Sequence, residues 1–296
     1  ATQPDRLNRV SAGAFELGSV FKSFTFAMAF DSGKVTMNDS FDASHPLRFG
    51  KFAIHDFHAK NRVLTVPEVF TYSSNVGSAR MALKVGSEGQ KAYLQRFGLL
   101  SKVKTELPEV AAPITPRRWA DITTATIAFG HGIAVTPLQV AVADAALVNG
   151  GKLIPPTFMP RTQAEADQLA VQVVKPETSE KLRYLFALNV EKGSGTKAAV
   201  PGYNVGGKTG TAEKVEHGRY SATKRLHSFL AAFPIDDPQY VVLIVIDEPK
   251  PEKEGAGATA GANAAPMVSA VIRRAAAILG VKPRSKAPDG AILVSN

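Results

Sequence analysis

Three short groups of serine, lysine and threonine residues in this sequence could together carry out nucleophilic chemistry. Ser19 stands three positions before Lys22, Ser73 stands two before Asn75, and Lys208-Thr209-Gly210 follows much later in the chain. If Ser19 opens a helix, its hydroxyl and the Lys22 amine lie one turn apart on the same face. A neutral amine in that position activates a serine nucleophile that has no histidine base. We therefore expect Ser19 to be the nucleophile and Lys22 to be its base.

The Ser-x-x-Lys spacing carries little weight alone, because it occurs four times, beginning at Ser19, Ser101, Ser194 and Ser221. A single copy usually belongs to a surface helix or loop. Only the copy at Ser19 lies before Ser73-Ser74-Asn75, which is the one Ser-x-Asn in the chain. The order Ser-x-x-Lys, Ser-x-Asn, Lys-Thr-Gly therefore selects Ser19 over the other three serines.

The residue types around this pair suit proton transfer. Lys22 can act as a base only in its neutral form, which burial or a nearby cation favours. Lys208 is the candidate for that cation. Ser73 can pass a proton to a departing amine, and Asn75 can hydrogen-bond an amide of the substrate.

The segment Lys208-Thr209-Gly210-Thr211 suits the recognition of a free carboxylate. Lysine supplies a point charge, and the two threonine hydroxyls supply hydrogen-bond donors. The glycine between them lets an edge strand approach the substrate closely. The backbone amides of Ser19 and Thr211 are the predicted oxyanion hole for an attacked carbonyl.

A nucleotide-binding loop is the remote alternative. Residues 202–209 satisfy the P-loop pattern, and the apolar run 241–246 before Asp247 resembles the strand and acid of such a site. A P-loop must follow a strand and open a helix. Residues 192–201 contain two glycines and a proline, and residues 210–219 are largely polar, so neither flank fits.

Composition limits the remaining classes of function. The chain has 296 residues, of which 45% are apolar, so it can bury a substantial core. It has no cysteine, which excludes disulfides and Cys-ligated zinc. His55-x-x-His58 has no third ligand at metal spacing, and we expect neither a metal nor a cofactor. The net charge of +9 predicts an anionic partner or surface, but it is spread along the chain, unlike a nucleic-acid arm.

Hydrophobic periodicity predicts an α+β fold in which many helices precede a sheet segment and a last helix follows it. We expect helices over residues 19–31, 66–70, 76–85, 88–97, 118–129, 137–149, 176–191 and 266–279. We expect strands over 205–214, 226–233 and 240–247, with a hairpin turn at Asp236-Asp237-Pro238. Residues 34–64 are expected to be irregular, 161–175 a surface excursion and 252–263 a loop. The spacing of Leu226, Phe229, Leu230 and Phe233 also fits a helix.

The three motifs and their surroundings resemble the transpeptidase domain of class B penicillin-binding proteins of the septal, FtsI type. The resemblance extends over nearly the whole chain. It rests on residues 15–19, 71–77, 128–132, 135–139, 206–212 and 245–249, which read FELGS, TYSSNVG, AFGHG, VTPLQ, GGKTGTA and VIDEP. This chain departs from the family at Leu17, where many members have proline, and at His131, where tyrosine is usual. We expect His131 to be a loop residue rather than part of the cleft.

The resemblance implies a fold like that of penicillin-binding proteins and serine β-lactamases. It implies one domain over 1–282, with an all-helical subdomain at 34–150, the sheet segment at 205–247, the helix 266–279 and a flexible tail at 283–296. It also implies a strand over 228–234. The family sheet has five antiparallel strands and begins upstream of the nucleophile, but only 18 residues precede Ser19. We therefore expect the N-terminal strands, the pedestal domain and a membrane anchor to lie outside this sequence.

The resemblance also implies a function. It predicts a peptidoglycan D,D-transpeptidase that cross-links stem peptides ending in D-Ala-D-Ala during cell division and is a target of β-lactams. The implied location is the periplasmic side of the bacterial inner membrane at the septum, with divisome proteins and a membrane glycosyltransferase as partners. A side activity as a D,D-carboxypeptidase is compatible with the same site. A serine β-lactamase or β-lactam sensor is the alternative, although we find no convincing Glu-x-x-x-Asn to activate a deacylating water.

Overall fold

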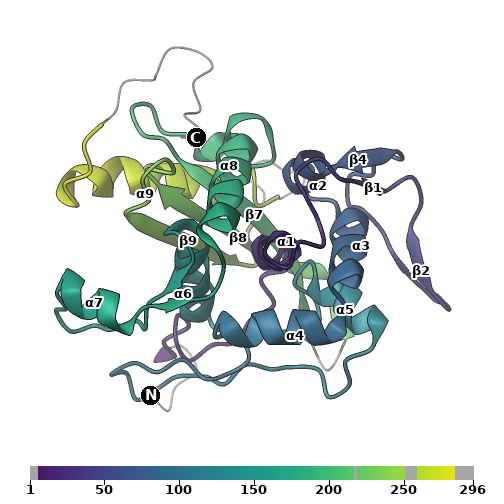
Figure 1. The fold of residues 1–296 in the computed structure, drawn as a ribbon, viewed down its shortest axis with the longest axis horizontal. Helices are drawn as coiled ribbons and strands as arrows, with labels where there is room; N and C mark the ends of the chain where they lie inside the picture. The colour runs from purple at the N-terminus through teal and green to yellow at the C-terminus, as the bar shows by residue number, and fades with distance from the viewer. Residues whose placement is uncertain (1–5, 217–218, 251–258, 284–296) are drawn as a thin grey trace.

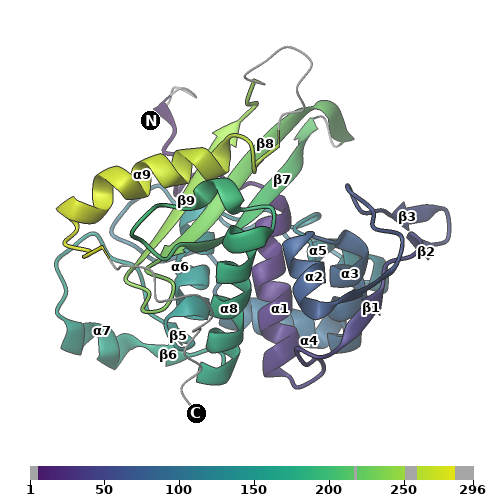
Figure 2. The same ribbon diagram turned by 90° about the horizontal axis from the view of Figure 1, so that it is seen from above.

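The computed structural model describes residues 6–216, 219–250 and 259–283. Its central element is helix α1 (Lys22–Asp31). Figures 1 and 2 show α1 between helices α2–α5 on one side and the antiparallel sheet β7-β8-β9 with helix α8 on the other. Helix α9 covers the far face of this sheet (Figure 2).

The helices of the described part are the 3-10 turns η2 (Gly18–Phe21) and η3 (Thr196–Ala198), and α1 (Lys22–Asp31), α2 (Val66–Thr71), α3 (Asn75–Val85), α4 (Ser87–Arg96), α5 (Asp121–Ile127), α6 (Pro137–Val148), α7 (Gln163–Leu169), α8 (Pro176–Lys192) and α9 (Ala264–Ile278). The strands are β1 (Ser40–Asp42), β2 (Leu47–Phe49), β3 (Phe52–Ile54), β4 (Val63–Thr65), β5 (Lys152–Leu153), β6 (Val171–Gln172), β7 (Gly206–Glu216), β8 (Arg219–Phe233) and β9 (Tyr240–Asp247). Each predicted helix is confirmed, with shifted ends.

Helix α1 is buried on every side, and all ten of its residues are shielded from solvent. Phenylalanine, alanine and methionine fill most of its positions, as expected for a helix that is enclosed on all sides. Its phenylalanines pack against rings from several elements. The ring centroid of Phe24 lies 5.7 Å from that of Phe97, and the ring centroid of Phe26 lies 5.0 Å from that of Phe70. The core therefore fixes the first residue of α1, Lys22, and the turn before it.

The main sheet confirms the strand prediction for the ambiguous segment. β8 pairs antiparallel with both β7 and β9. Leu226 and Leu230 join the core on the α1 side, whereas Phe229 and Phe233 join the cluster that contains α9. A strand covered on both faces has apolar residues at odd and even positions, and their spacing can imitate a helix.

The structure corrects one prediction outside the main sheet. Residues 34–64 are not irregular, because β1 pairs with β4 and β2 pairs with β3, so the subdomain at 34–150 is not all-helical. These strands have three residues each, which is too short for a period of two to stand out. The predicted surface excursion 161–175 contains α7, which has no buried residue and whose first turn has a capping box between Thr162 and Glu165.

Some predictions fall on parts of the chain that the structure does not cover. The main sheet has three strands in the described ranges rather than five, and before Ser19 these ranges add a single bridge from Phe15 to Val135. The predicted tail 283–296 lies outside the described residues except for its first residue. Of the predicted loop 252–263, only 259–263 is described. Among described residues, no helix combines the length and apolar character required for a membrane span.

Candidate active site

Ser19 lies on the 3-10 turn that leads into α1, and two close backbone contacts hold this turn. Gly18 has a φ of +61°, and a β-carbon on it would collide with the carbonyl of Thr211 on β7. A β-carbon on Gly130, in the turn after α5, would collide with the Gly18 carbonyl. Glycine tolerates both the positive φ and the close approach. The nucleophile turn is therefore wedged between β7 and the turn after α5.

The structure brings Ser19, Lys22, Ser73 and Asn75 together. The Lys22 Nζ lies 2.9 Å from Ser19 Oγ, 3.0 Å from Ser73 Oγ, 2.8 Å from Asn75 Oδ1 and 2.6 Å from the Ser73 carbonyl oxygen. The amide and carbonyl oxygens can only accept hydrogen bonds, so they take the two protons of a neutral amine. The lone pair of Lys22 then remains for a serine hydroxyl, which is the arrangement a general base requires.

Burial and a second cation favour that neutral form. The Lys22 side chain is fully buried, which lowers its pKa well below the usual value, and the charge of Lys208 lowers the pKa further. The Asp56 carboxylate acts weakly in the opposite direction. Burial also lowers the pKa of Lys208 to about 7. The Lys208 Nζ lies 2.9 Å from Ser73 Oγ, so the Ser73 hydroxyl bridges two amines.

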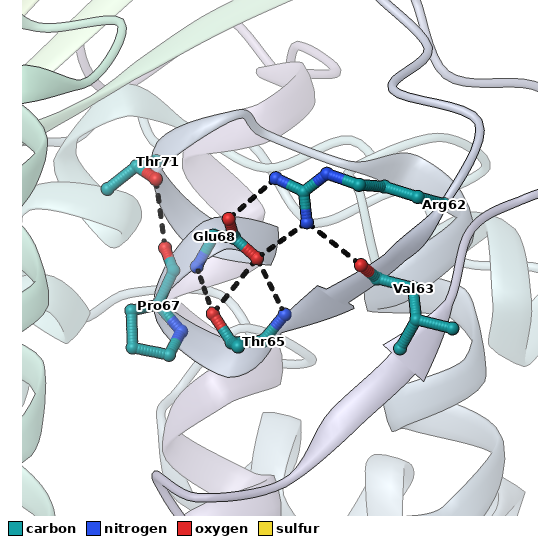
Figure 3. A network of polar contacts seen from close by, with 6 residues as sticks. All are labelled: Arg62, Val63, Thr65, Pro67, Glu68 and Thr71. Atoms are coloured by element: carbon teal, nitrogen blue, oxygen red, sulfur yellow. Dashed lines mark hydrogen bonds and ion pairs between the residues drawn. The ribbon is translucent and has the colours of Figure 1, made fainter.

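Helix α2 delivers Ser73 to this site, and Figure 3 shows how the start of α2 is fixed. Thr65 and Glu68 form a capping box, and the Arg62 guanidinium donates to both oxygens of Glu68, at 2.6 Å and 3.0 Å. These bonds, the one from Arg62 first, lower the pKa of Glu68 to about 2. The spacing Thr65-x-x-Glu68 is a sequence signature of a helix start that our sequence analysis missed.

Ser73 stands in a strained turn between α2 and α3. Its φ is +58°, a left-handed conformation that is uncommon for residues other than glycine. The turn is held because the Ser73 amide donates to the Phe70 carbonyl at 3.1 Å and the Ser74 amide donates to the Val69 carbonyl at 2.9 Å. Strain of this kind persists where the surroundings fix the backbone, and it often marks functional residues.

Asp56 holds the Ser-x-Asn motif in place through two hydrogen bonds, and the sequence analysis missed it. Its carboxylate accepts a hydrogen bond from Ser74 Oγ at 2.7 Å and one from the Val76 amide at 2.9 Å. The Asn75 Nδ2 donates to the His55 carbonyl at 3.0 Å, which turns Asn75 Oδ1 toward Lys22. No short motif signals this role, because it depends on contacts across 18 or more residues.

The predicted carboxylate-binding residues lie together on β7. Gly210 fits closely beneath the nucleophile turn, because a β-carbon on it would collide with the Leu17 carbonyl and the Ser228 hydroxyl. The Lys208 side chain is fully buried and points at Ser73. Thr211 is exposed, whereas Thr209 is nearly buried. The predicted oxyanion amides, those of Ser19 and Thr211, belong to the two segments that meet at Gly18.

The remaining motif matches do not form comparable sites. Lys208 lies inside β7, which pairs antiparallel with β8, so it does not open a helix and the P-loop alternative is wrong. His55 contributes its backbone carbonyl rather than its ring. In the described ranges, no group of three histidine or carboxylate residues could hold a metal ion.

His131 lies closer to the site than we expected. It stands in the turn after α5, where its ring lies 5.3 Å from that of Tyr220, stacked at 24°, and 5.1 Å from that of Phe129. Burial and the charge of Lys22 lower the pKa of His131 to about 4. His131 is a loop residue, as predicted, but it lies near enough to Lys22 to belong to the surroundings of the site. Tyr220 also donates to Glu16 at 3.1 Å, which ties the tip of the β7–β8 hairpin to the segment before Ser19.

Comparisons with known proteins agree with this geometry. A family model described as the penicillin binding protein transpeptidase domain matches residues 1–273. The probable peptidoglycan D,D-transpeptidase FtsI of Caulobacter vibrioides is 42% identical over 97% of this chain and 50% of its own length. Stage V sporulation protein D of Bacillus subtilis is 35% identical over 91% of this chain and 43% of its own length.

A solved structure agrees as well. The transpeptidase domain of Burkholderia pseudomallei penicillin-binding protein 3 superimposes with a TM-score of 0.85 at 31% identity, covering 94% of this chain and 84% of that one. This chain spans about half the length of the curated relatives it matches. With the three motifs converging on one serine, the chain belongs to the penicillin-binding protein transpeptidase family, among the class B members of the FtsI type.

Proposed function

We propose that this chain is the catalytic domain of a peptidoglycan D,D-transpeptidase that acts in cell division. The observation that supports this most directly is the contact of the buried Lys22 amine with the hydroxyls of both Ser19 and Ser73. The substrate is a stem peptide ending in D-Ala-D-Ala. Because the chain covers about half of its relatives, this activity is proposed for the longer protein to which such a domain belongs.

In the first half of the reaction, Ser19 Oγ attacks the carbonyl carbon of the penultimate D-Ala and its proton passes to Lys22. The negative charge on the substrate oxygen is stabilised by the backbone amides of Ser19 and Thr211. The C–N bond then breaks, and Ser73 passes a proton to the departing amine of the last D-Ala. The product is an acyl-enzyme ester on Ser19.

In the second half, an amine from a neighbouring strand attacks the ester carbonyl. The amine loses a proton to the site, Ser19 Oγ regains one, and a cross-link replaces the ester. Attack by water instead would give carboxypeptidase activity. A β-lactam presents the same type of carbonyl and a carboxylate, so it acylates Ser19 in the same way and is released slowly.

A serine β-lactamase needs a group that activates a deacylating water, such as a glutamate carboxylate, and the surroundings of Lys22 do not favour this alternative. The carboxylate whose charge acts on Lys22 is Asp56. Both of its oxygens already accept hydrogen bonds, from Ser74 and Val76. These two bonds favour a role for Asp56 in holding the Ser-x-Asn motif rather than in activating a water.

The same proposal includes a location and partners. We place the domain on the periplasmic side of the inner membrane at the septum, joined to a membrane anchor upstream and working with divisome proteins that include a glycosyltransferase. The similarity to FtsI of Caulobacter vibrioides supports the septal location. The net charge of +9 suits a protein that works beside anionic cell-envelope polymers.

Labelling with a fluorescent penicillin tests the proposal. We expect stable label on the denatured protein band, and none in a Ser19→Ala variant whose circular dichroism is unchanged. Ser221→Ala, which removes the serine of another Ser-x-x-Lys copy, should label like the unaltered protein. Rapid loss of label would favour a β-lactamase, and labelling that persists in Ser19→Ala would refute the assignment of the nucleophile.

A further inference from the structure

The third Ser-x-x-Lys copy has its own place in the site. Ser194 follows α8 in the turn Gly193-Ser194-Gly195, and its Oγ lies 2.7 Å from Oγ1 of Thr209. A β-carbon on Gly193 would collide with the side chain of Asn189, so the turn wraps closely around that residue. Ser194 is therefore held against the Lys-Thr-Gly motif at a distance typical of a good hydroxyl–hydroxyl bond.

Asn189 has a defined orientation in this cluster. Its Nδ2 donates to the Gly207 carbonyl at 2.8 Å, and its Oδ1 accepts from the Ser194 amide at 3.1 Å. A carbonyl only accepts and an amide N–H only donates, so these two bonds exclude the flipped amide. Asn189 is fully buried. The oxygen of Asn189 therefore faces Ser194, whose Oγ also lies 3.2 Å from it.

The Ser194 hydroxyl thus has one proton and two acceptors, Asn189 Oδ1 and Thr209 Oγ1. If Ser194 donates to Asn189, then Thr209 must donate to Ser194 to make the 2.7 Å contact. If Ser194 donates to Thr209, then Thr209 Oγ1 accepts from Ser194 and from Lys208 Nζ, which lies 3.4 Å away. Both lone pairs of Thr209 are then occupied, and its own proton is free to point at a ligand.

We propose that Ser194, oriented by Asn189, is a positioning residue. It lets the Thr209 hydroxyl change between donating its hydrogen bond to Ser194 and donating it to the carboxylate of the substrate. Without a carboxylate, the proton of Thr209 is directed to Ser194, and that of Ser194 to Asn189. When a carboxylate binds, Thr209 turns its proton to the anion, and Ser194 turns its proton to Thr209. No buried hydroxyl loses a partner in either state, so the change costs little.

This proposal rests on the proposed function, in which Thr209 binds the free carboxylate of a stem peptide or a penicillin. It explains why Asn189 is polar although the buried residues around it near the end of α8, Leu185, Phe186, Leu188 and Val190, are apolar. It also gives Ser194 a role that requires a hydroxyl but neither a base nor a nucleophile.

The test compares acylation by a fluorescent penicillin with acylation by its methyl ester, in which the carboxylate is blocked. Because a hydrogen bond to a charged group is strong, we expect Ser194→Ala to slow acylation by the free acid about tenfold, with the ester rate unchanged. Ser194→Thr keeps a hydroxyl and should restore most of the free-acid rate. Ser101→Ala is the matched control from another Ser-x-x-Lys copy, because its side chain is exposed, and should change neither rate.

The ester rate reports whether the Ser19 site is intact in each variant. An equal loss with acid and ester, or no loss with either, would overturn the role of Ser194. A failure of Ser194→Thr to recover the free-acid rate would also count against it. If the unaltered protein is acylated by neither compound, the proposed function fails; if only the acid-to-ester ratio is insensitive to Ser194, the proposed function stands without the switch.

Discussion

Replacing Lys208 by glutamine is expected to move the acid limb of the pH–rate profile, the part where the rate of Ser19 acylation falls at low pH, to higher pH. Acylation requires neutral Lys22, so its rate falls as the pH drops through the pKa of Lys22. The positive charge of Lys208 lowers that pKa, and it is present below the Lys208 pKa of about 7. Glutamine is uncharged, so the pKa of Lys22 rises in the variant and the limb follows it upward.

The size of the shift follows from the distances around Ser73. Its Oγ lies 3.0 Å from the Lys22 Nζ and 2.9 Å from the Lys208 Nζ, so the two charges lie no more than about 6 Å apart. Two like charges at about 6 Å repel by about 3 kcal/mol at an effective dielectric constant of about 20, which equals about two pKa units. We therefore expect the acid limb to move to higher pH by about one to two pH units.

The assay is the second-order rate of acylation by a fluorescent penicillin, measured from about pH 5 to about pH 9 so that the range spans both amines. The position of the limb is compared, not its height, because the variant also loses a charge that attracts the carboxylate. Lys208→Arg keeps the charge and is the control, whose limb should stay near that of the unaltered protein. An acid limb in Lys208→Gln that stays in place or moves to lower pH would refute repulsion between the two lysines.

Two further predictions concern carboxyl groups. Asp56→Asn removes a charge that raises the pKa of Lys22, so the acid limb of the pH–rate profile should move to lower pH. Acylation should also slow, because Ser74 and Val76 lose a charged hydrogen-bond acceptor. A limb that moves to higher pH in the same assay would contradict this. Asp144 is fully buried on α6, where burial raises its pKa and a contact with the Ser23 hydroxyl lowers that pKa by less. A raised carboxyl pKa costs stability above the unfolded-state value of about 4, so Asp144→Asn should raise the melting temperature more at about pH 8 than at about pH 4. Equal gains at both pH values would contradict that reasoning.

The order of three short motifs in the sequence was enough to select Ser19 from four serines with the same local spacing. The helices were also predictable, because segments such as α8 are long enough for the helical spacing of their apolar residues to be recognised. The strand β8 was not decided by periodicity, since both of its faces are covered and its apolar residues imitate a helix. The two short pairs β1·β4 and β2·β3 were missed, because strands of three residues have no readable period.

Residue types and order along the chain therefore indicated the groups of the candidate site, and the tertiary structure decided their burial, contacts and charge states. The sequence suggested Lys208 as the second cation, but the burial of Lys22 and the proximity of the two amines, which lower the pKa of Lys22, exist only in the folded chain. Asp56 has no sequence signature, and the Ser-x-x-Lys match at Ser194 does not reveal its contact with Thr209. Proton positions and charge states depend on distances between groups far apart in sequence, and only the folded chain sets those distances.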